Sequence, residues 1–393
     1  MKQAIVLAAG EGQRLRPFTV SRPKAMLAVA DKPVLRYVVE ALSANGIRDI
    51  IMVVGYHKEQ VYDYFGAGEE LGVDIRYVEQ EPPLGTAHAL KQAAALADDS
   101  FIVLPGDNLV NAATLRDIIA GAVPAVLVKS VEDASRYGVA TLEDGGIGRI
   151  QEKPPVAETN LASTGIYLFD RDIFEYAADV LDIPDAINNM IADGVTFRAV
   201  RTDDRWLDIV YPEDIISLNN IILQDVRNQV SGNIEDGAVI NGEVVIGAGT
   251  VVRSGTHIYG PAVIGSGCDI GPCACVKAGS SFGDNVVIGP FCFVENSVFG
   301  DDVSLGPNSL VSNSVIGSGS IIRGRFTATG GRGLAADFGE GDRRSRDVGV
   351  IMGEDCEIEA NVAVEAGTII GNGCRVRMAR VLSGRLPDKS VVY

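Results

Sequence analysis

The second half of this chain repeats an apolar position every six residues. Aliphatic or phenylalanine side chains recur at this interval over ten positions from Ile240 to Val294, and glycine often follows them. The spacing slips by one residue twice and then resumes near the C-terminus. The later positions are Phe299, Leu305, Val311, Ile316, Ile322, Met352, Ile358, Val364, Ile370 and Val376. A six-residue period is typical of flat-sided coils stacked on one another, so the pattern predicts a hexapeptide-repeat β-helix over 230–393.

Residues 323–350 interrupt this period and are rich in arginine. The arginines are Arg323, Arg325, Arg332, Arg343, Arg344 and Arg346. We expect a loop that is ejected from the coil. Its cations are either solvated or hold a ligand that carries phosphate, such as coenzyme A.

The cysteines also lie in the second half. Four of them, Cys268, Cys292, Cys356 and Cys374, stand two places before a repeat position, where small apolar residues such as Val244 also occur. This placement predicts that they pack inside the coil. A metal site is the alternative, but the C-x4-C-x-C spacing near residue 270 is not one that zinc sites use.

The first half alternates apolar strands with amphipathic helices. Strands are expected at 4–7, 50–54, 73–78 and 101–104, with helices that begin near 33, 58 and 85. Shorter strands follow residue 124. The last elements are a helix at 182–193, a strand at 195–200 and a long helix from 211 to about 230. This order predicts an α/β fold with a doubly wound, mostly parallel sheet, whose ligands bind at the carboxyl ends of the strands.

A glycine-rich segment follows the first strand. Gly10 and Gly12 let the backbone turn where a side chain would clash, and exposed N–H groups in such a turn bind anions. Four cations come next, at Arg14, Arg16, Arg22 and Lys24. The segment has neither the third glycine of a dinucleotide-binding loop nor the Lys-Ser/Thr of a Walker loop. A surface turn with solvated arginines is the plain alternative, but the combination indicates a site for a nucleoside triphosphate.

The net charge of −18 argues against nucleic acid or an anionic membrane as a partner. It also makes the cations at 14–24 more informative, because an anionic substrate must overcome the overall field. No signal peptide and no apolar run long enough to span a bilayer are recognisable. We therefore expect a cytoplasmic protein.

The pattern Gly10-x-Gly12-x-Arg14, followed by Pro23-Lys24, resembles the sugar-1-phosphate nucleotidylyltransferases. With the repeat that follows, nearly the whole chain resembles the archaeal bifunctional sugar-1-phosphate nucleotidylyltransferase/acetyltransferases. The resemblance implies a Rossmann-like nucleotidyltransferase domain at 1–229 and a left-handed β-helix at 230–393.

The resemblance also implies roles for residues on the nucleotide side. Arg14 and Lys24 stabilise the triphosphate and the transition state, while Asp107 and Asp208 hold Mg²⁺. Asp107 stands just past a buried strand, where a carboxylate suits a metal that bridges phosphates, although a turn aspartate is the alternative. The nucleotide-binding residues are Leu7, Ala9, Gly10, Gly12, Gln80, Gly85 and Thr86. The Gln80 amide offers a donor and an acceptor to a pyrimidine edge, and His88 is interpreted as structural.

The sugar phosphate is expected to bind Gly138, Glu152, Lys153 and Thr164. A glutamate accepts hydrogen bonds from sugar hydroxyls, and a nearby lysine holds the phosphate. Glu152-Lys153-Pro154 by itself could be any surface turn, but its order along the chain matches the family. Ser163 departs from the asparagine or valine that many members carry.

We expect the enzyme to form an NDP-sugar and pyrophosphate from UTP or dTTP and glucose-1-phosphate or N-acetylglucosamine-1-phosphate. The family's acetyltransferase uses a histidine base, but the corresponding segment here, 305–310, has none, and His257 lies on another coil. We therefore expect acetyl transfer to be weak or absent, and the β-helix to serve a trimer or a dimer of trimers. The alternatives are a bifunctional enzyme that also uses acetyl-CoA, and a sugar-nucleotide sensor or scaffold without catalysis.

Overall fold

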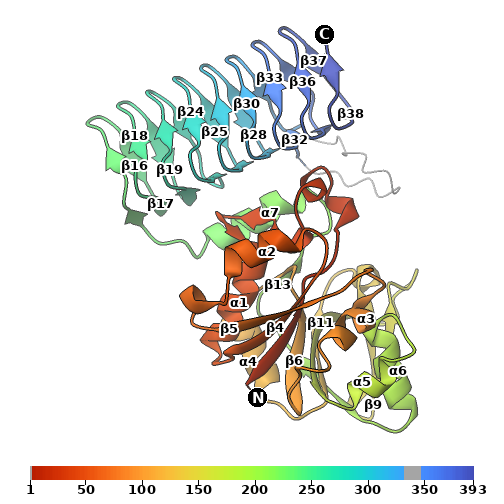
Figure 1. The fold of residues 1–393 in the computed structure, drawn as a ribbon. Helices are drawn as coiled ribbons and strands as arrows, with labels where there is room; N and C mark the ends of the chain where they lie inside the picture. Colours follow the sequence, from red (N-terminus) through yellow and green to blue (C-terminus); the bar gives the residue numbers. More distant parts are fainter. Residues whose placement is uncertain (1, 332–346) are drawn as a thin grey trace. The chain divides into compact units, whose positions relative to one another are not determined.

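The computed structural model describes residues 2–331 and 347–393, which form two compact units (Figure 1). The first unit comprises the chain up to Glu11, Arg22–Met26 and Pro33–Asp208. The second comprises Gly12–Ser21, Leu27–Lys32 and Ile209–Tyr393. No helix in the described part of the chain is long and apolar enough to cross a membrane.

A nine-stranded sheet forms the centre of the first unit, in the order β5-β4-β1-β6-β11-β8-β12-β10-β9. Its strands are β1 (Gln3–Leu7), β4 (Asp49–Val54), β5 (Asp74–Glu79), β6 (Ser100–Pro105), β8 (Ala125–Ser130), β9 (Gly138–Glu143), β10 (Gly146–Glu152), β11 (Leu161–Asp170) and β12 (Phe197–Arg201). The strands β5, β4, β1 and β6 run parallel, and β11 runs antiparallel to both β6 and β8. Leu7 lies opposite Val53 and Pro105, so three carboxyl ends meet at one edge.

Helices cover both faces of this sheet, which confirms the predicted doubly wound architecture. They are α1 (Val34–Ala44), α2 (Lys58–Phe65), α3 (Thr86–Gln92), α4 (Ala112–Ile119), α5 (Ile173–Tyr176) and α6 (Ile183–Ala192). Alternate residues of β1 enter different cores: Val6 packs with Leu35 of α1, and Ile5 packs with Leu90 of α3 and Ile187 of α6. Period-two alternation in a strand with two covered faces produces this division.

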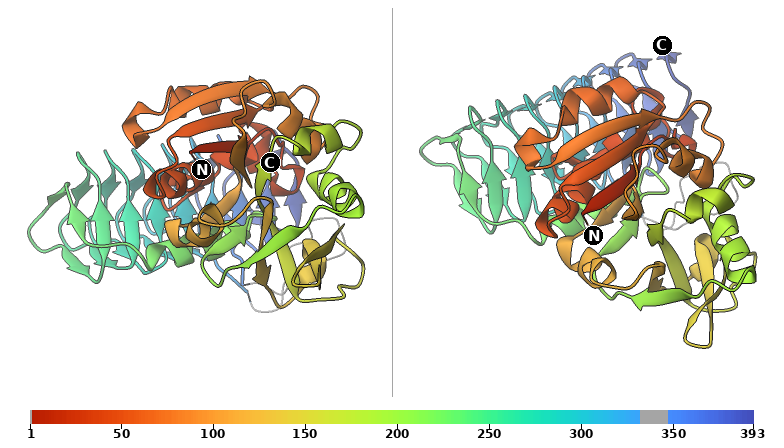
Figure 2. Two further views of the ribbon diagram at one scale, coloured as in Figure 1. Left: turned by 90° about the horizontal axis from the view of Figure 1, so that it is seen from below. Right: turned by 60° about the horizontal axis from the view of Figure 1, so that its bottom comes forward.

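The second unit contains three parallel sheets stacked coil upon coil, which confirms the predicted β-helix (Figure 2). The first sheet contains β14 (Gln229–Val230), β17 (Val244–Ile246), β20 (Ala262–Ile264), β23 (Ser281–Phe282), β26 (Val298–Phe299), β29 (Val315–Ile316), β32 (Val350–Met352), β35 (Thr368–Ile370) and β38 (Arg385–Leu386). The second contains β15 (Asn233–Ile234), β18 (Val251–Val252), β21 (Asp269–Ile270), β24 (Val287–Ile288), β27 (Ser304–Leu305), β30 (Ile321–Ile322), β33 (Glu357–Ile358), β36 (Arg375–Val376) and β39 (Val391–Val392). The third contains β16 (Val239–Asn241), β19 (His257–Tyr259), β22 (Cys275–Val276), β25 (Phe293–Glu295), β28 (Leu310–Ser312), β31 (Thr327–Ala328), β34 (Ala363–Val364) and β37 (Val381–Leu382).

The repeat positions fill the inside of this coil. From Ile246 onward they are buried in one continuous apolar cluster, together with Cys268, Cys292, Cys356 and Cys374, as the packing interpretation of these cysteines predicts. The first slip of the period has a local cause. Three residues, 295–297, separate Val294 from the start of β26, whereas four, 277–280, separate its register partner Val276 from the start of β23 one coil earlier.

The predicted loop at 323–350 is only partly described. Its residues 332–346, with Arg332, Arg343, Arg344 and Arg346, lie outside the described residues. Two of its described segments belong to the coil, because β31 pairs with β28 and β34, and β32 pairs with β29 and β35.

Helix α7 (Asp214–Leu223) packs within the second unit. The helix predicted to reach residue 230 ends at Leu223, because Gln229–Val230 instead pair with β17 as the first strand of the coil. The fully buried Asn219 fixes α7 to the coil: its amide donates to the Gly279 carbonyl at 2.8 Å and accepts from the Ser281 hydroxyl at 2.6 Å.

Two short N-terminal segments also pack in the second unit. In Gly12–Ser21, the Pro17 carbonyl accepts a hydrogen bond from the Asn372 amide at 2.9 Å, and the Ser21 hydroxyl donates to the Glu354 carboxylate. In Leu27–Lys32, Ala30 packs against Leu223 and Val263. The compact units therefore divide at Asp208, and the chain passes between them several times before that point. The boundary at 229/230 stays a prediction.

Candidate functional site

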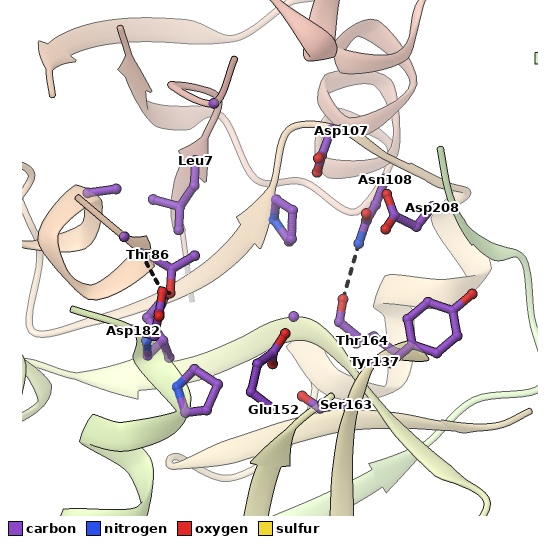
Figure 3. A pocket seen from close by; sticks show the side chains of 18 of the residues that line it. Leu7, Thr86, Asp107, Asn108, Tyr137, Glu152, Ser163, Thr164, Asp182 and Asp208 are labelled. Atoms are coloured by element: carbon purple, nitrogen blue, oxygen red, sulfur yellow. Dashed lines mark hydrogen bonds between the residues drawn. The ribbon is translucent and has the colours of Figure 1, made fainter. Parts of the chain in front are cut away.

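A two-stranded ladder brings the two predicted metal ligands together. Strand β7 (Asn108–Val110) starts directly after β6 and pairs antiparallel with β13 (Trp206–Asp208). Asp208 lies opposite Asn108 in this register, which puts it next to Asp107 although the two are far apart in sequence. Figure 3 shows the side chains of Asp107, Asn108 and Asp208 on the same side of the pocket.

Lys24 lies between these carboxylates. Its Nζ is 2.6 Å from Asp107 Oδ2 and 2.8 Å from Asp208 Oδ1, and its side chain is 17% exposed. Burial of the ammonium works against its charge, but the two carboxylates outweigh burial and raise the pKa of Lys24 above its ordinary value. Three of the four charged groups expected around the triphosphate are thus brought together.

The three groups lie beside a cavity of about 580 Å³ in the first unit. Most predicted site residues line it: Leu7, Ala9, Gly10, Gln80, Gly85, Thr86, Asp107, Gly138, Glu152, Lys153, Thr164 and Asp208. They come from β1, β5, β6, α3, β9, β10, β11 and β13 and the turns that follow these strands. A volume of this size suits a nucleotide or sugar phosphate.

The other predicted residues, Gly12 and Arg14, belong to the second unit, where Arg14 is exposed. Gly12 has φ +67°, in the left-handed region that favours glycine, as the turn argument predicts. The same argument is wrong for Gly10, because no atom that a Cβ would clash with lies within 4 Å. The catalytic role of Arg14 stays a prediction.

At one end of the cavity, Gln80 is held by two partners. Its Nε2 donates to the Gly85 carbonyl at 2.9 Å and lies 3.0 Å from His88 Nδ1. Gly85 has φ +145°, and a Cβ at this position would lie 2.3 Å from the Leu181 carbonyl oxygen, so only glycine fits. The Asp182 carboxylate accepts from both the Thr86 N–H and its hydroxyl at 3.1 Å.

At the other end, the side chains expected to bind the sugar gather around Gly138. The Glu152 carboxylate would lie 3.1 Å from a Cβ on Gly138, so a side chain there would displace it. Lys153 Nζ is 3.6 Å from Glu152 Oε1. Figure 3 shows Glu152 and Ser163 together on this side. Burial raises the pKa of Tyr167, whose hydroxyl is 3.4 Å from that of Ser163, to about 12.

The backbone carbonyl of Thr164, rather than its hydroxyl, makes the contacts with neighbouring site residues. The hydroxyl donates to the Leu127 carbonyl at 2.8 Å. The Thr164 carbonyl accepts from Asn108 Nδ2 at 3.1 Å and from Trp206 Nε1 at 3.0 Å. Asn108 and Trp206 thereby connect the sheet to the ladder that carries Asp208.

Sequence reasoning missed Asn108, Asp182 and Trp206 as parts of the site. Asn108 had a usable signal, since it follows Asp107 at the end of a buried strand. Asp182 had none, because its partner Thr86 lies 96 residues earlier in the chain. His88 was interpreted as structural, and its contact with Gln80 is described only by the structure.

The pair Asp107 and Asp208 fits a magnesium ion. Both carboxylates reach the same cation, Lys24 Nζ, so their oxygens already converge on a single positive charge. Mg²⁺ prefers one or two carboxylates, with substrate phosphates and water completing its shell, and both side chains are partly exposed toward the cavity.

Comparison with known proteins gives matches over both halves of the chain. Residues 3–225 match the family described as nucleotidyl transferase. The glucose-1-phosphate thymidylyltransferase of Streptomyces antibioticus is 36% identical over 300 residues, which cover 72% of this chain and 83% of that protein. The bifunctional protein GlmU of Methanocaldococcus jannaschii is 30% identical over 410 residues, covering 99% of this chain and 97% of that protein. The solved structure of a UDP-glucose pyrophosphorylase from Acinetobacter baumanii is 25% identical, with a TM-score of 0.51, and the match covers 57% of this chain and 94% of that one.

Proposed function

Since this chain belongs to the nucleotidyl transferase family, we propose that it joins UTP or dTTP to a hexose-1-phosphate and releases pyrophosphate. Glucose-1-phosphate and N-acetylglucosamine-1-phosphate are the proposed sugar substrates. One observation carries the proposal: Lys24, Asp107 and Asp208 converge beside a cavity that also contains the buried Gln80 and the Glu152 carboxylate.

The proposed reaction is a direct displacement. An oxygen of the sugar phosphate attacks the α-phosphorus, a new P–O bond forms, and the bond between the α-phosphorus and the bridging oxygen breaks to release pyrophosphate. No covalent enzyme intermediate is needed, so positioning and charge stabilisation account for the catalysis. Lys24 would offset the charge of the triphosphate, and Arg14 is proposed to do the same.

Asp107 and Asp208 would hold Mg²⁺. When bound, the ion offsets the negative charge that the phosphate oxygens gain in the transition state. The chain's own contribution is to keep the two carboxylates together through the β7–β13 ladder and to supply Lys24 beside them.

The remaining residues would position the substrates. Gln80 faces the base, and Glu152 accepts hydrogen bonds from the sugar hydroxyls while Lys153 contacts the sugar phosphate. Tyr167 stays protonated at neutral pH because burial raises its pKa to about 12, so it offers a neutral hydroxyl near Ser163.

Asp107→Asn tests the proposal. We expect this variant to fold normally but to release pyrophosphate about 100-fold more slowly or worse, because a neutral amide replaces a metal-binding carboxylate. Asp63→Asn, a change of an exposed acid on α2, serves as the matched control. Pyrophosphate release is measured over a grid of nucleoside triphosphates and sugar-1-phosphates.

Two results would contradict the proposal. Near-normal turnover by Asp107→Asn would exclude Asp107 as a metal ligand. Binding of nucleotide by the wild-type protein with no turnover of any sugar-1-phosphate would favour the sensor or scaffold.

Acetyl transfer is the second candidate, because the match to the bifunctional protein GlmU covers 99% of this chain. Against it, the segment from Leu305 to Leu310 has no histidine, and the Ser309 hydroxyl is buried and donates to the Gly306 carbonyl at 2.7 Å. Consumption of acetyl-CoA with glucosamine-1-phosphate would support this activity, and no consumption would exclude it for that substrate.

We further propose that the β-helix assembles into a trimer or a dimer of trimers. The third sheet carries a column of outward residues in register, and its most exposed apolar members, Val239, Leu310 and Val381, are 37%, 38% and 71% exposed. Exposed apolar surface of this kind often marks an interface. Sedimentation equilibrium of the full chain measures the oligomeric state, and a monomeric mass would contradict the proposal.

A further inference from the structure

Both N–H donors of the Gln80 side chain have acceptors within the protein. A glutamine amide has two N–H donors and one oxygen acceptor. The Gly85 carbonyl, which can only accept, lies 2.9 Å from one side-chain atom and identifies that atom as nitrogen. His88 Nδ1 lies 3.0 Å from the same nitrogen. Among the described residues, nothing donates a hydrogen bond to Oε1.

This arrangement determines the tautomer of His88. Since Gln80 Nε2 is a donor, His88 Nδ1 must accept, and the ring proton then lies on Nε2. On that side of the ring, the Gln92 amide nitrogen donates to the His88 carbonyl at 3.1 Å, and its distance of 3.4 Å from His88 Nε2 joins two donors and is no hydrogen bond. The ring is therefore a neutral acceptor behind Gln80.

The backbone around this contact is fixed. Gly85 cannot be replaced without a clash with Leu181, and the Ala87 N–H donates to the Leu181 carbonyl at 2.8 Å. The start of α3 is also tied to Asp182 through Thr86. These contacts fix the position of His88 relative to Gln80. The Gln80 residue is 4% exposed and lines the cavity, whereas His88 does not line it.

We infer that His88 is a specificity-determining residue: by engaging the amide nitrogen of Gln80, it leaves only the oxygen for the base. An oxygen acceptor fits the N3–H of uracil or thymine. It does not fit N3 of cytosine, which carries a lone pair and would face the oxygen unpaired. The inference rests on the proposed function, since it places a pyrimidine at Gln80, and it assigns a positioning role to a side chain that touches no substrate.

Two variants of nearly equal size test the inference. Asparagine has an oxygen two bonds from Cβ, where histidine has Nδ1, so His88→Asn keeps the acceptor. His88→Leu has a methyl group there and removes one of the two contacts that hold the Gln80 amide nitrogen, so only the Gly85 carbonyl still opposes a turn of the amide. Lys91→Met, on the same helix but bonded to the Ala178 carbonyl, is the control. Circular dichroism verifies folding, and His88→Ala replaces the leucine variant if that one does not fold.

The first measurement is calorimetric binding of UTP and of CTP to the full chain with Mg²⁺ present. The affinity ratio of UTP to CTP is expected to fall about tenfold in His88→Leu, the value of one hydrogen bond. The ratio should stay near wild type in His88→Asn and Lys91→Met. The ratio of kcat/KM for the two nucleotides with glucose-1-phosphate should follow the same order.

A merely structural histidine would give a different result. In that case His88→Leu weakens both nucleotides equally and the ratio does not move, which would overturn the inference. Equal binding of UTP and CTP by the wild-type protein, or binding of neither, would overturn it as well. If the wild type prefers UTP but turns over no sugar-1-phosphate, the proposed function fails while the binding ratios still decide the role of His88.

Discussion

Lys24 lies between Asp107 and Asp208, the two carboxylates that are proposed to hold the divalent cation. Two positive charges cannot share that position without strong repulsion. We therefore expect Lys24→Met to bind Mn²⁺ about tenfold more tightly than the wild type when no nucleotide is present. Free Mn²⁺ is measured by electron paramagnetic resonance during titration of the protein.

The control is Lys91→Met, which removes a lysine that contacts a carbonyl outside this cluster. Unchanged or weaker Mn²⁺ binding by Lys24→Met would show that the ammonium does not compete with the metal. Tighter binding would mean that the triphosphate has to draw Lys24 away before the metal can settle, so that the metal arrives together with the nucleotide.

At the scale of secondary structure, Arg253 joins neighbouring coils of the β-helix. Its guanidinium is 2.7 Å from Asp269 and 3.1 Å from Glu235. Arg253 lowers the pKa of Asp269, and the Ser254 N–H together with Arg253 lowers the pKa of Glu235. Carboxylates with a lowered folded-state pKa add stability that is present above their unfolded pKa and lost as the pH falls through the folded pKa.

Arg253→Met should therefore lower the Tm at pH 7, and its difference from the wild type should shrink as the pH falls below about 4. The three side chains are partly exposed, so the drop should be about 2 °C or less. Calorimetric scans at several pH values measure it. Arg375→Met, which removes a longer contact of 3.5 Å to Glu357 in the same sheet, is the control. A difference that stays constant from pH 7 to pH 3 would contradict the explanation.

At the scale of the whole molecule, the segment Gly12–Ser21 packs with residues that come at least 333 positions later in the chain. Asn372 donates a hydrogen bond to the Pro17 carbonyl, and Ser21 donates one to the Glu354 carboxylate. Replacing both Asn372 and Glu354 by alanine should loosen this segment. We expect trypsin to cut after Arg14 about tenfold faster than in the wild type, because cleavage follows local opening. The exposed Glu357→Ala is the control, and fragment masses identify the site. An unchanged rate would show that these two contacts do not hold the segment.

The fold could be predicted to the extent that its signals are local. The six-residue period places Ile246, Ile264 and Phe282 inside the coil because each coil repeats the environment of the one before it. The strand from Ala4 to Leu7 likewise follows from its apolar run. The C-terminal end of α7 was missed because Gln229–Val230 form the first strand of the coil, and this strand lies before Ile240, where the six-residue period begins.

The site was predictable where a residue type and its place at a strand end coincide, as for Asp107 and Gln80. It was not predictable where the contact joins distant residues of ordinary type. Lys24 was expected to contact the triphosphate. Its hydrogen bond to Asp208, which lies 184 residues later in the chain, was not expected. Pro17 and Asn372 are 355 residues apart, and neither has a sequence pattern that indicates the other.

That last contact has a consequence for synthesis. On the ribosome, Ser21 is delivered 333 residues before Glu354, and Pro17 is delivered 355 residues before Asn372. The segment that carries Arg14 therefore cannot acquire these neighbours until the coils that contain them have been made. A nascent chain that is interrupted before those coils emerge would expose this arginine-bearing segment to the cell's proteases.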